Sequence, residues 1–185
     1  MPTLGADNGI AVAMGMAILA DKTMNTLLHV FEGYSGLYQA TKDQRIAERI
    51  REMMDIFVAK IYNTELHRQE VFFDAEYNTL IDLHSYGHDI ESAWLLDWGC
   101  SLLEDEQLNA KLIPLFTEMA QNVYEKAYHG VGLYNECERG VDDKKRIWWV
   151  QAETVVGFMN AWQRNPEMTH FLKASQEVWA YIKEK

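Results

Sequence analysis

Cysteine and proline are scarce in this sequence: its 185 residues include two cysteines and three prolines. Cys100 and Cys137 form no spacing motif, which argues against a disulfide framework or a cysteine-based metal site. The simplest expectation is a reduced chain in the cytoplasm, although two cysteines could still pair. Motifs for covalent catalysis are absent too. No Gly-x-Ser-x-Gly sequence occurs, so a serine nucleophile has no support. There is no phosphate-binding loop either.

Positive charge is also in short supply. There are 17 Lys and Arg residues against 28 Asp and Glu, giving a net charge of −11, which argues against binding to nucleic acid or to anionic membranes. The apolar run at 10–20 is too short to cross a bilayer. The residues before it include Asp7 but no Lys or Arg, unlike a secretory signal. We expect residues 1–20 to be a lead-in and residues 21–185 to form the domain.

Hydrophobic residues make up 48% of the chain, and they recur mainly at three- and four-residue steps. This periodicity predicts an all-α fold with short β-hairpins in its long loops. The predicted helices span 21–40, 45–62, 88–103, 108–128, 147–163 and 167–185. A hairpin is expected within 130–145 and a short strand at 71–73.

The predicted helices form a repeat. The turns at Asp43, Glu106 and Glu167 lie 63 and 61 residues apart. The sequence therefore predicts three helical hairpins, in which one helix of each pair forms an inner layer whose N-terminal ends face a common pocket. Three hairpins make only an arc, and a ring requires more pairs from further chain or another subunit. We expect a homo-oligomer, since an arc leaves apolar faces exposed.

Polar and aromatic side chains recur at the N-terminal end of each predicted inner helix. They are Asn25, His29 and Glu32; His88 and Glu91; and Trp148, Trp149, Gln151 and Glu153. Any one of these could be a buried polar group satisfied by loop backbone. Recurrence in three repeats favours a shared site instead. An exposed indole beside carboxylates and histidines suits a sugar, whose ring has an apolar face and a hydroxyl edge.

His88 stands at the predicted start of the third helix. We expect Gly87, directly before it, to mark a break in regular structure ahead of that helix. A helix N-terminus disfavours the imidazolium, so this histidine would tend to stay neutral, while Glu91 would oppose that tendency. A metal at His84, His88 and Glu91 is a weaker alternative, because His84 would precede the helix and need not share its face. We expect no metal and no cofactor.

Three segments resemble the motifs of the cellobiose 2-epimerases. Residues 24–32 are similar to the family's Asn-Thr-x-Leu-His-x-x-Glu signature, and residues 85–96 and 148–153 match two further motifs in the same order and spacing. The likeness runs from about Asp21 to the C-terminus. The wider group is the N-acylglucosamine 2-epimerase superfamily. The resemblance implies an α/α toroid, with this chain supplying three hairpins of an (α/α)6 barrel.

The resemblance also implies a reaction on a mono- or disaccharide: inversion of C2 in the reducing-end aldose. After ring opening, a base removes the C2 proton, a cis-enediolate forms, and a proton returns to the other face. By resemblance, His88 is one of two histidines that transfer the C2 proton. His29 is also expected to be catalytic: it binds the sugar near O1 or O5 and helps ring opening or stabilises the enediolate. Glu91 would act with them and hold a hydroxyl. The expected sugar-binding residues are Asn25, Trp148, Trp149 and Glu153.

The sequence departs from the family pattern at both ends. The family has a substrate-binding arginine before the first motif and a second catalytic histidine in a Pro-Tyr-His-like segment after the last, and this chain contains neither. We therefore expect the central and C-terminal part of an epimerase. Alternatives are conversion of N-acylglucosamine or mannose, or a non-catalytic helical-repeat protein that keeps a carbohydrate pocket.

Overall fold

The computed structural model describes residues 23–185, so the lead-in expected at 1–20 lies outside the described residues. All six predicted helices are present in the described part. They are α2 (Met24–Thr41), α3 (Gln44–Ile56), α4 (Tyr86–Leu103), α5 (Glu106–Ala127), α6 (Trp148–Arg164) and α7 (Thr169–Glu184). A π-helical turn, η1 (Phe57–Ile61), continues α3. None of the helices described is long and apolar enough to cross a membrane.

The first two helical hairpins turn by the same local means. Each inner helix ends at a residue in the left-handed conformation, Lys42 (φ 54°) or Glu104 (φ 52°). An aspartate follows at once, and its side chain accepts from a backbone N–H of the next helix: Asp43 from Arg45 at 2.9 Å and Asp105 from Leu108 at 3.1 Å. These caps stop one helix and start the next within two residues, so the repeat seen in the sequence has a structural cause.

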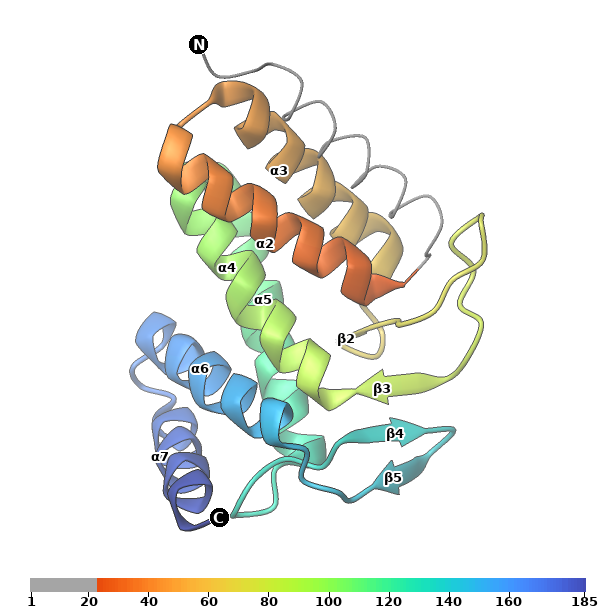
Figure 1. Ribbon diagram of the computed structural model, residues 1–185, viewed down its shortest axis with the longest axis vertical. Coiled ribbons are helices and arrows are strands. Elements are labelled where there is room, and N and C mark those ends of the chain that lie inside the picture. Colours follow the sequence, from red (N-terminus) through yellow and green to blue (C-terminus); the bar gives the residue numbers. More distant parts are fainter. Residues whose placement is uncertain (1–22) are drawn as a thin grey trace.

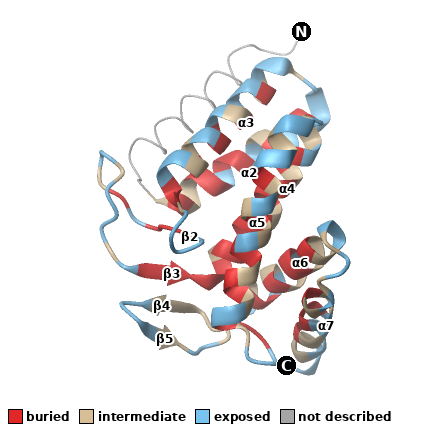
Figure 2. Ribbon diagram, turned by 180° about the vertical axis from the view of Figure 1, so that it is seen from behind, coloured by how far each residue is buried: buried red, intermediate tan, exposed pale blue. Residues whose placement is uncertain are grey.

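The helices form two layers (Figure 1). The inner helices α2, α4 and α6 contact one another in that order, and α3, α5 and α7 each pack behind their own partner. The central α4 has 13 of its 18 residues buried, and the buried positions gather where it meets its neighbours (Figure 2). Close packing depends on glycine. A Cβ at Gly99 would lie 2.2 Å from the ring of Phe31, and one at Gly157 would lie 2.5 Å from Ile90.

Short strands fill the long loops. They are β1 (Tyr62–Asn63) with β2 (Arg68–Gln69), and an antiparallel sheet in the order β3 (Leu83–Ser85), β4 (Glu136–Glu138), β5 (Val141–Asp143). The predicted hairpin within 130–145 is confirmed as β4–β5. The predicted strand at 71–73 is wrong, since Phe72 and Phe73 make only isolated bridges. Strand β3 was not expected, because all three of its residues are buried and show no alternation.

The start of α4 differs from the prediction. The helix begins at Tyr86, so Gly87 lies inside its first turn. The predicted break in regular structure at Gly87 is therefore wrong. The role of Gly87 is steric. A Cβ at this position would lie 2.6 Å from the indole of Trp149 and 2.7 Å from Val150. The glycine therefore lets α6 approach the N-terminal end of α4, which brings Trp149 next to His88.

Candidate active site

The N-terminal ends of α2, α4 and α6 lie on the side of the molecule that carries the strands (Figure 1). Contacts between the three helices place their polar residues together. His29 of α2 has its Nε2 atom 3.9 Å from Oε1 of Glu91 on α4. The ring of His88 on α4 lies 4.9 Å from the ring of Trp149 on α6. Each inner helix thus contributes to one surface, the polar wall, which includes His29, His88, Glu91 and Trp149.

His88 is a largely buried imidazole at the start of a helix. Its Nδ1 atom lies 2.7 Å from the hydroxyl of Ser85, and its ring is tilted by 49° against Trp149. Burial lowers the pKa of His88, and nearby His29 lowers it further, while Asp89 acts in the opposite direction. The ring is therefore neutral at physiological pH, the state in which an imidazole can accept a proton.

Glu91 has the most strongly raised pKa in this wall. Its side chain is only 10% exposed. Burial and, to a smaller degree, the neighbouring carboxylates of Glu153 and Glu32 raise the pKa of Glu91, and His29 lowers it, so that the pKa is about 7. A carboxyl group with this pKa can hold or release a proton near neutral pH, as acid–base chemistry requires.

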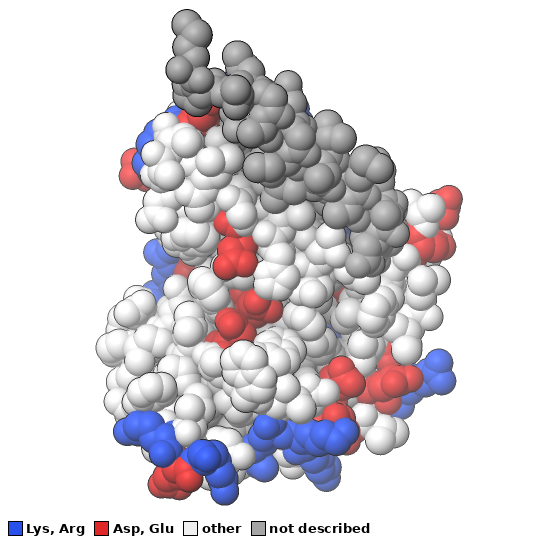
Figure 3. All heavy atoms as spheres, in the orientation of Figure 1, with Lys and Arg blue, Asp and Glu red and all other residues white. Residues whose placement is uncertain are grey.

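Glu153 and Glu32 complete an acidic group on this face, where Figure 3 shows carboxylates within a largely uncharged surround. The indole N–H of Trp94 donates to Oε2 of Glu153 at 2.8 Å. Burial raises the pKa of Glu153, opposed by that hydrogen bond. Glu32 is half exposed and lies 3.0 Å from Nδ1 of His29. The wall is thus rich in oxygen acceptors, which suits hydroxyl groups.

The two remaining predicted sugar-binding residues, Trp148 and Asn25, differ in exposure. Trp148 is 80% exposed, so it remains open to solvent while its neighbour Trp149 packs against His88. Asn25 is partly buried, and its Oδ1 atom has no hydrogen-bond partner among residues 23–185. Sequence reasoning assigned no role to Trp94 or Ser85, although both lie in the motif around His88.

Next to the wall is a cavity of about 540 Å³. Trp94 and Trp98 of α4 line it together with Val155, Val156 and Met159 of α6. The polar residues of its lining are Glu32, Asn160 and Gln163. The two tryptophans are four residues apart and therefore share a face of α4. A mainly apolar cavity with a few polar residues in its lining is the form that small-molecule sites usually take.

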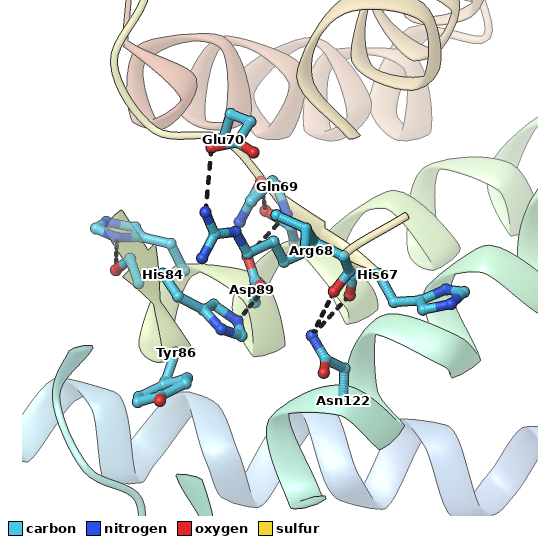
Figure 4. A network of polar contacts seen from close by, with 12 residues as sticks. His67, Arg68, Gln69, Glu70, His84, Tyr86, Asp89 and Asn122 are labelled. Atoms are coloured by element: carbon cyan, nitrogen blue, oxygen red, sulfur yellow. Dashed lines mark hydrogen bonds and ion pairs between the residues drawn. The ribbon is translucent and has the colours of Figure 1, made fainter. Parts of the chain in front are cut away.

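His84 belongs to a different, buried cluster (Figure 4). Its Nε2 atom lies 2.7 Å from Oδ2 of Asp89, with both side chains almost completely buried. The backbone N–H of Gln69 donates to Oδ1 of Asp89 at 3.3 Å, and the hydroxyl of Ser92 donates to Oε1 of Gln69 at 3.0 Å. The cluster ties β2 to the first turns of α4. Within residues 23–185, no three His, Cys, Asp or Glu side chains are placed to hold a metal ion.

The profile of the N-acylglucosamine 2-epimerase (GlcNAc 2-epimerase) family matches residues 17–185. Among curated relatives, the cellobiose 2-epimerase of Eubacterium cellulosolvens is 40% identical, and that of Dictyoglomus turgidum is 42% identical. The matches cover 91% and 90% of this chain but 45% and 43% of those proteins. The chain therefore spans less than half the length of these relatives.

Solved structures agree with the sequence comparisons. A sugar epimerase from a ruminal bacterium superposes with a TM-score of 0.86 at 39% identity, covering 88% of this chain and 42% of that one. The cellobiose 2-epimerase of Bacillus thermoamylovorans B4167 gives a TM-score of 0.81 at 36% identity, covering 88% and 41%. The predicted fold class is confirmed: the described helices are hairpins of an α/α toroid.

Proposed function

The chain belongs to the N-acylglucosamine 2-epimerase family, and from this premise we propose that it carries one half of the acid–base machinery of a carbohydrate 2-epimerase. The observation that carries the proposal is the convergence of His29, His88 and Glu91 from two inner helices, beside Trp149 and Glu153 from the third.

His88 is the proposed base. Its lowered pKa keeps the imidazole neutral, and Nδ1 is occupied by Ser85, so Nε2 is the nitrogen left to meet a substrate. In the proposed step the C2–H bond of the open-chain sugar breaks. The proton passes to Nε2, and the electron pair forms the C1–C2 double bond of a cis-enediolate whose charge rests on the C1 oxygen.

His29, Glu91 and Asn25 would stabilise that intermediate. His29 stands opposite Glu91, and a donor at this position can hydrogen-bond to the oxygen that gains charge. Glu91, with its pKa of about 7, can exchange a proton with a sugar hydroxyl. The unpaired Oδ1 of Asn25 can accept from another hydroxyl.

The substrate we propose is a disaccharide with an aldose at its reducing end, such as cellobiose or mannobiose. The curated relatives named above are cellobiose 2-epimerases, which supports this class. Trp149 offers an aromatic face beside His88 for the reacting sugar, and the solvent-exposed Trp148 is free to contact a second ring. An N-acylglucosamine or mannose is the second choice.

The resemblance implies a second catalytic histidine and a substrate-binding arginine, which the family carries outside the three motifs found at residues 24–32, 85–96 and 148–153. For this chain the proposal is therefore proton exchange at C2, with complete epimerisation requiring groups from elsewhere. A homo-oligomer stays a prediction, which light scattering tests: a well-folded monomer would contradict it.

The test is proton NMR of the chain in D2O with cellobiose, mannose and N-acetylglucosamine in separate samples. Loss of the C2 proton signal is expected with cellobiose, and the His88→Ala variant should abolish it. His67→Ala is the matched control, because His67 is half exposed and contacts Glu118 outside the site. Binding of cellobiose without exchange, in a chain shown to be folded, would contradict the catalytic proposal and favour a carbohydrate-binding protein.

A further inference from the structure

The two histidines of the site have chemically different partners. Nδ1 of His29 faces the carboxylate of Glu32 at 3.0 Å, whereas Nδ1 of His88 faces the hydroxyl of Ser85 at 2.7 Å. A carboxylate favours the charged imidazolium, because opposite charges attract. A hydroxyl orients the ring through a hydrogen bond but brings no net charge. Ser85 is thus a partner that leaves a neutral histidine neutral.

Ser85 is fixed in place by the fold. It ends strand β3, where it pairs with Glu136 of β4, and it is only 5% exposed. It also stands at the N-cap position of α4, where a serine side chain normally accepts from a backbone N–H of the helix. No such bond forms here. The hydroxyl contacts His88 and does not cap the backbone N–H groups at the start of α4. A departure of this kind from the usual capping pattern is typical of functional positions.

The other surroundings of His88 do not provide this orientation. Asp89 on α4 and His29 on α2 act on it as charges, and α6 presents the uncharged indole of Trp149. Among residues 23–185, Ser85 is the one hydrogen-bond partner of the His88 ring. Removing the hydroxyl would leave the ring packed against Trp149 but free to rotate about its side-chain bonds.

We propose that Ser85 is a positioning residue, whose hydroxyl aims Nε2 of His88 at the substrate without placing a charge beside the ring. The catalytic meaning of this inference rests on the proposed function, but the contact can be measured without a substrate. When Nε2 acts as a base, Nδ1 carries the ring proton and donates it to the Ser85 oxygen. The same hydrogen bond persists after Nε2 has gained a proton, so the ring keeps its aim through the step.

The test is a pH titration of His88 by NMR in protein labelled at histidine with ¹⁵N. Ser85→Asp places a carboxylate beside Nδ1 and should raise the pKa of His88 by about one unit or more. Ser85→Ala should change the ring ¹⁵N shifts, and Ser85→Thr should restore them because it keeps the hydroxyl. Ser175→Ala is the matched control: its buried hydroxyl donates to the Val155 carbonyl at 3.0 Å, outside the site.

An identical His88 titration in wild type, Ser85→Ala and Ser85→Asp would overturn the proposal. If Ser85→Ala does not fold, the Asp and Thr variants decide the question.

Kinetics separates this inference from the proposed function. If the wild type exchanges the C2 proton, Ser85→Ala should lower kcat about tenfold or more with little change in KM, and Ser85→Thr should recover most of it. If no sugar is exchanged but the titration responds as expected, the proposed function fails and the positioning contact stands. If exchange occurs and Ser85→Ala leaves kcat unchanged, the positioning role is wrong and the proposed function stands.

Discussion

Two polar clusters lie along the first turns of α4, and they differ in how tightly they are paired. His84 and Asp89 are almost completely buried and 2.7 Å apart. In the other cluster His29 is half exposed, its Nε2 atom is 3.9 Å from Glu91, and burial raises the pKa of Glu91. The first cluster pairs its histidine directly with a carboxylate inside the fold, and Nε2 of Gln69 is its one buried side-chain atom without a partner among residues 23–185. The second has charge and hydrogen-bonding capacity left over, which is typical of sites that act on a ligand.

The difference implies a division of roles. The paired cluster should be important for stability and unimportant for chemistry, because it joins β2 to α4 away from the open face. The unpaired cluster should reduce stability, because it keeps carboxyl groups close together and partly desolvated. The following variants test this comparison, from the largest expected effect to the smallest.

Asp89→Ala should give the largest effect. It leaves the buried His84 ring without its partner and the Gln69 N–H without an acceptor, which should lower the free energy of unfolding by about 3 kcal/mol or more. Urea unfolding followed by circular dichroism measures the loss. Asp82→Ala is the control, since Asp82 is mostly exposed in its pair with Arg68 and should cost about 1 kcal/mol or less. Equal losses would contradict the assigned role of the buried pair.

Glu91→Gln should make the protein more stable at alkaline pH. The pKa of Glu91 is about 7 in the folded state, whereas an ordinary glutamate has a pKa of 4.5, so the folded state binds more protons than the unfolded state between these values. Wild-type stability should therefore fall as pH rises from 4.5 to 7. The variant lacks this slope and should gain on the order of 1–3 kcal/mol at pH 8 relative to pH 4. Parallel profiles of stability against pH for the two proteins would show that the pKa of Glu91 is not raised.

Gly87→Ala tests whether the steric clash with Trp149 outweighs the higher helix propensity of alanine. Its Cβ would overlap the indole of Trp149, so we expect a loss of about 1 kcal/mol and a shifted indole NMR signal for that residue. Gly36→Ala is the matched change, because Gly36 occupies an exposed position of α2 with nothing within 4 Å of the added carbon. Without a clash, alanine should stabilise that helix by about 0.5–1 kcal/mol. A stabilising Gly87→Ala would mean that Trp149 moves freely.

Local sequence determined the helices and their repeat. Periodic apolar residues and aspartate caps act within a few positions of one another, so the hairpins could be predicted from the chain alone. The motif residues His29, His88, Glu91, Trp149 and Glu153 could also be identified from sequence, because their recurrence at helix starts does not depend on contacts. Whether each acts as assigned stays a prediction.

Only the tertiary structure decided which of these residues meet, and in what state. Strand β3 exists because β4 pairs with it, and α6 can approach the first turn of α4 because Gly87 leaves room for Trp149. The pKa of Glu91 is raised because burial and Glu153, far along the chain, act on it together. Strand pairing, close packing and desolvation all depend on neighbours brought together by folding, and a local sequence pattern does not specify those neighbours.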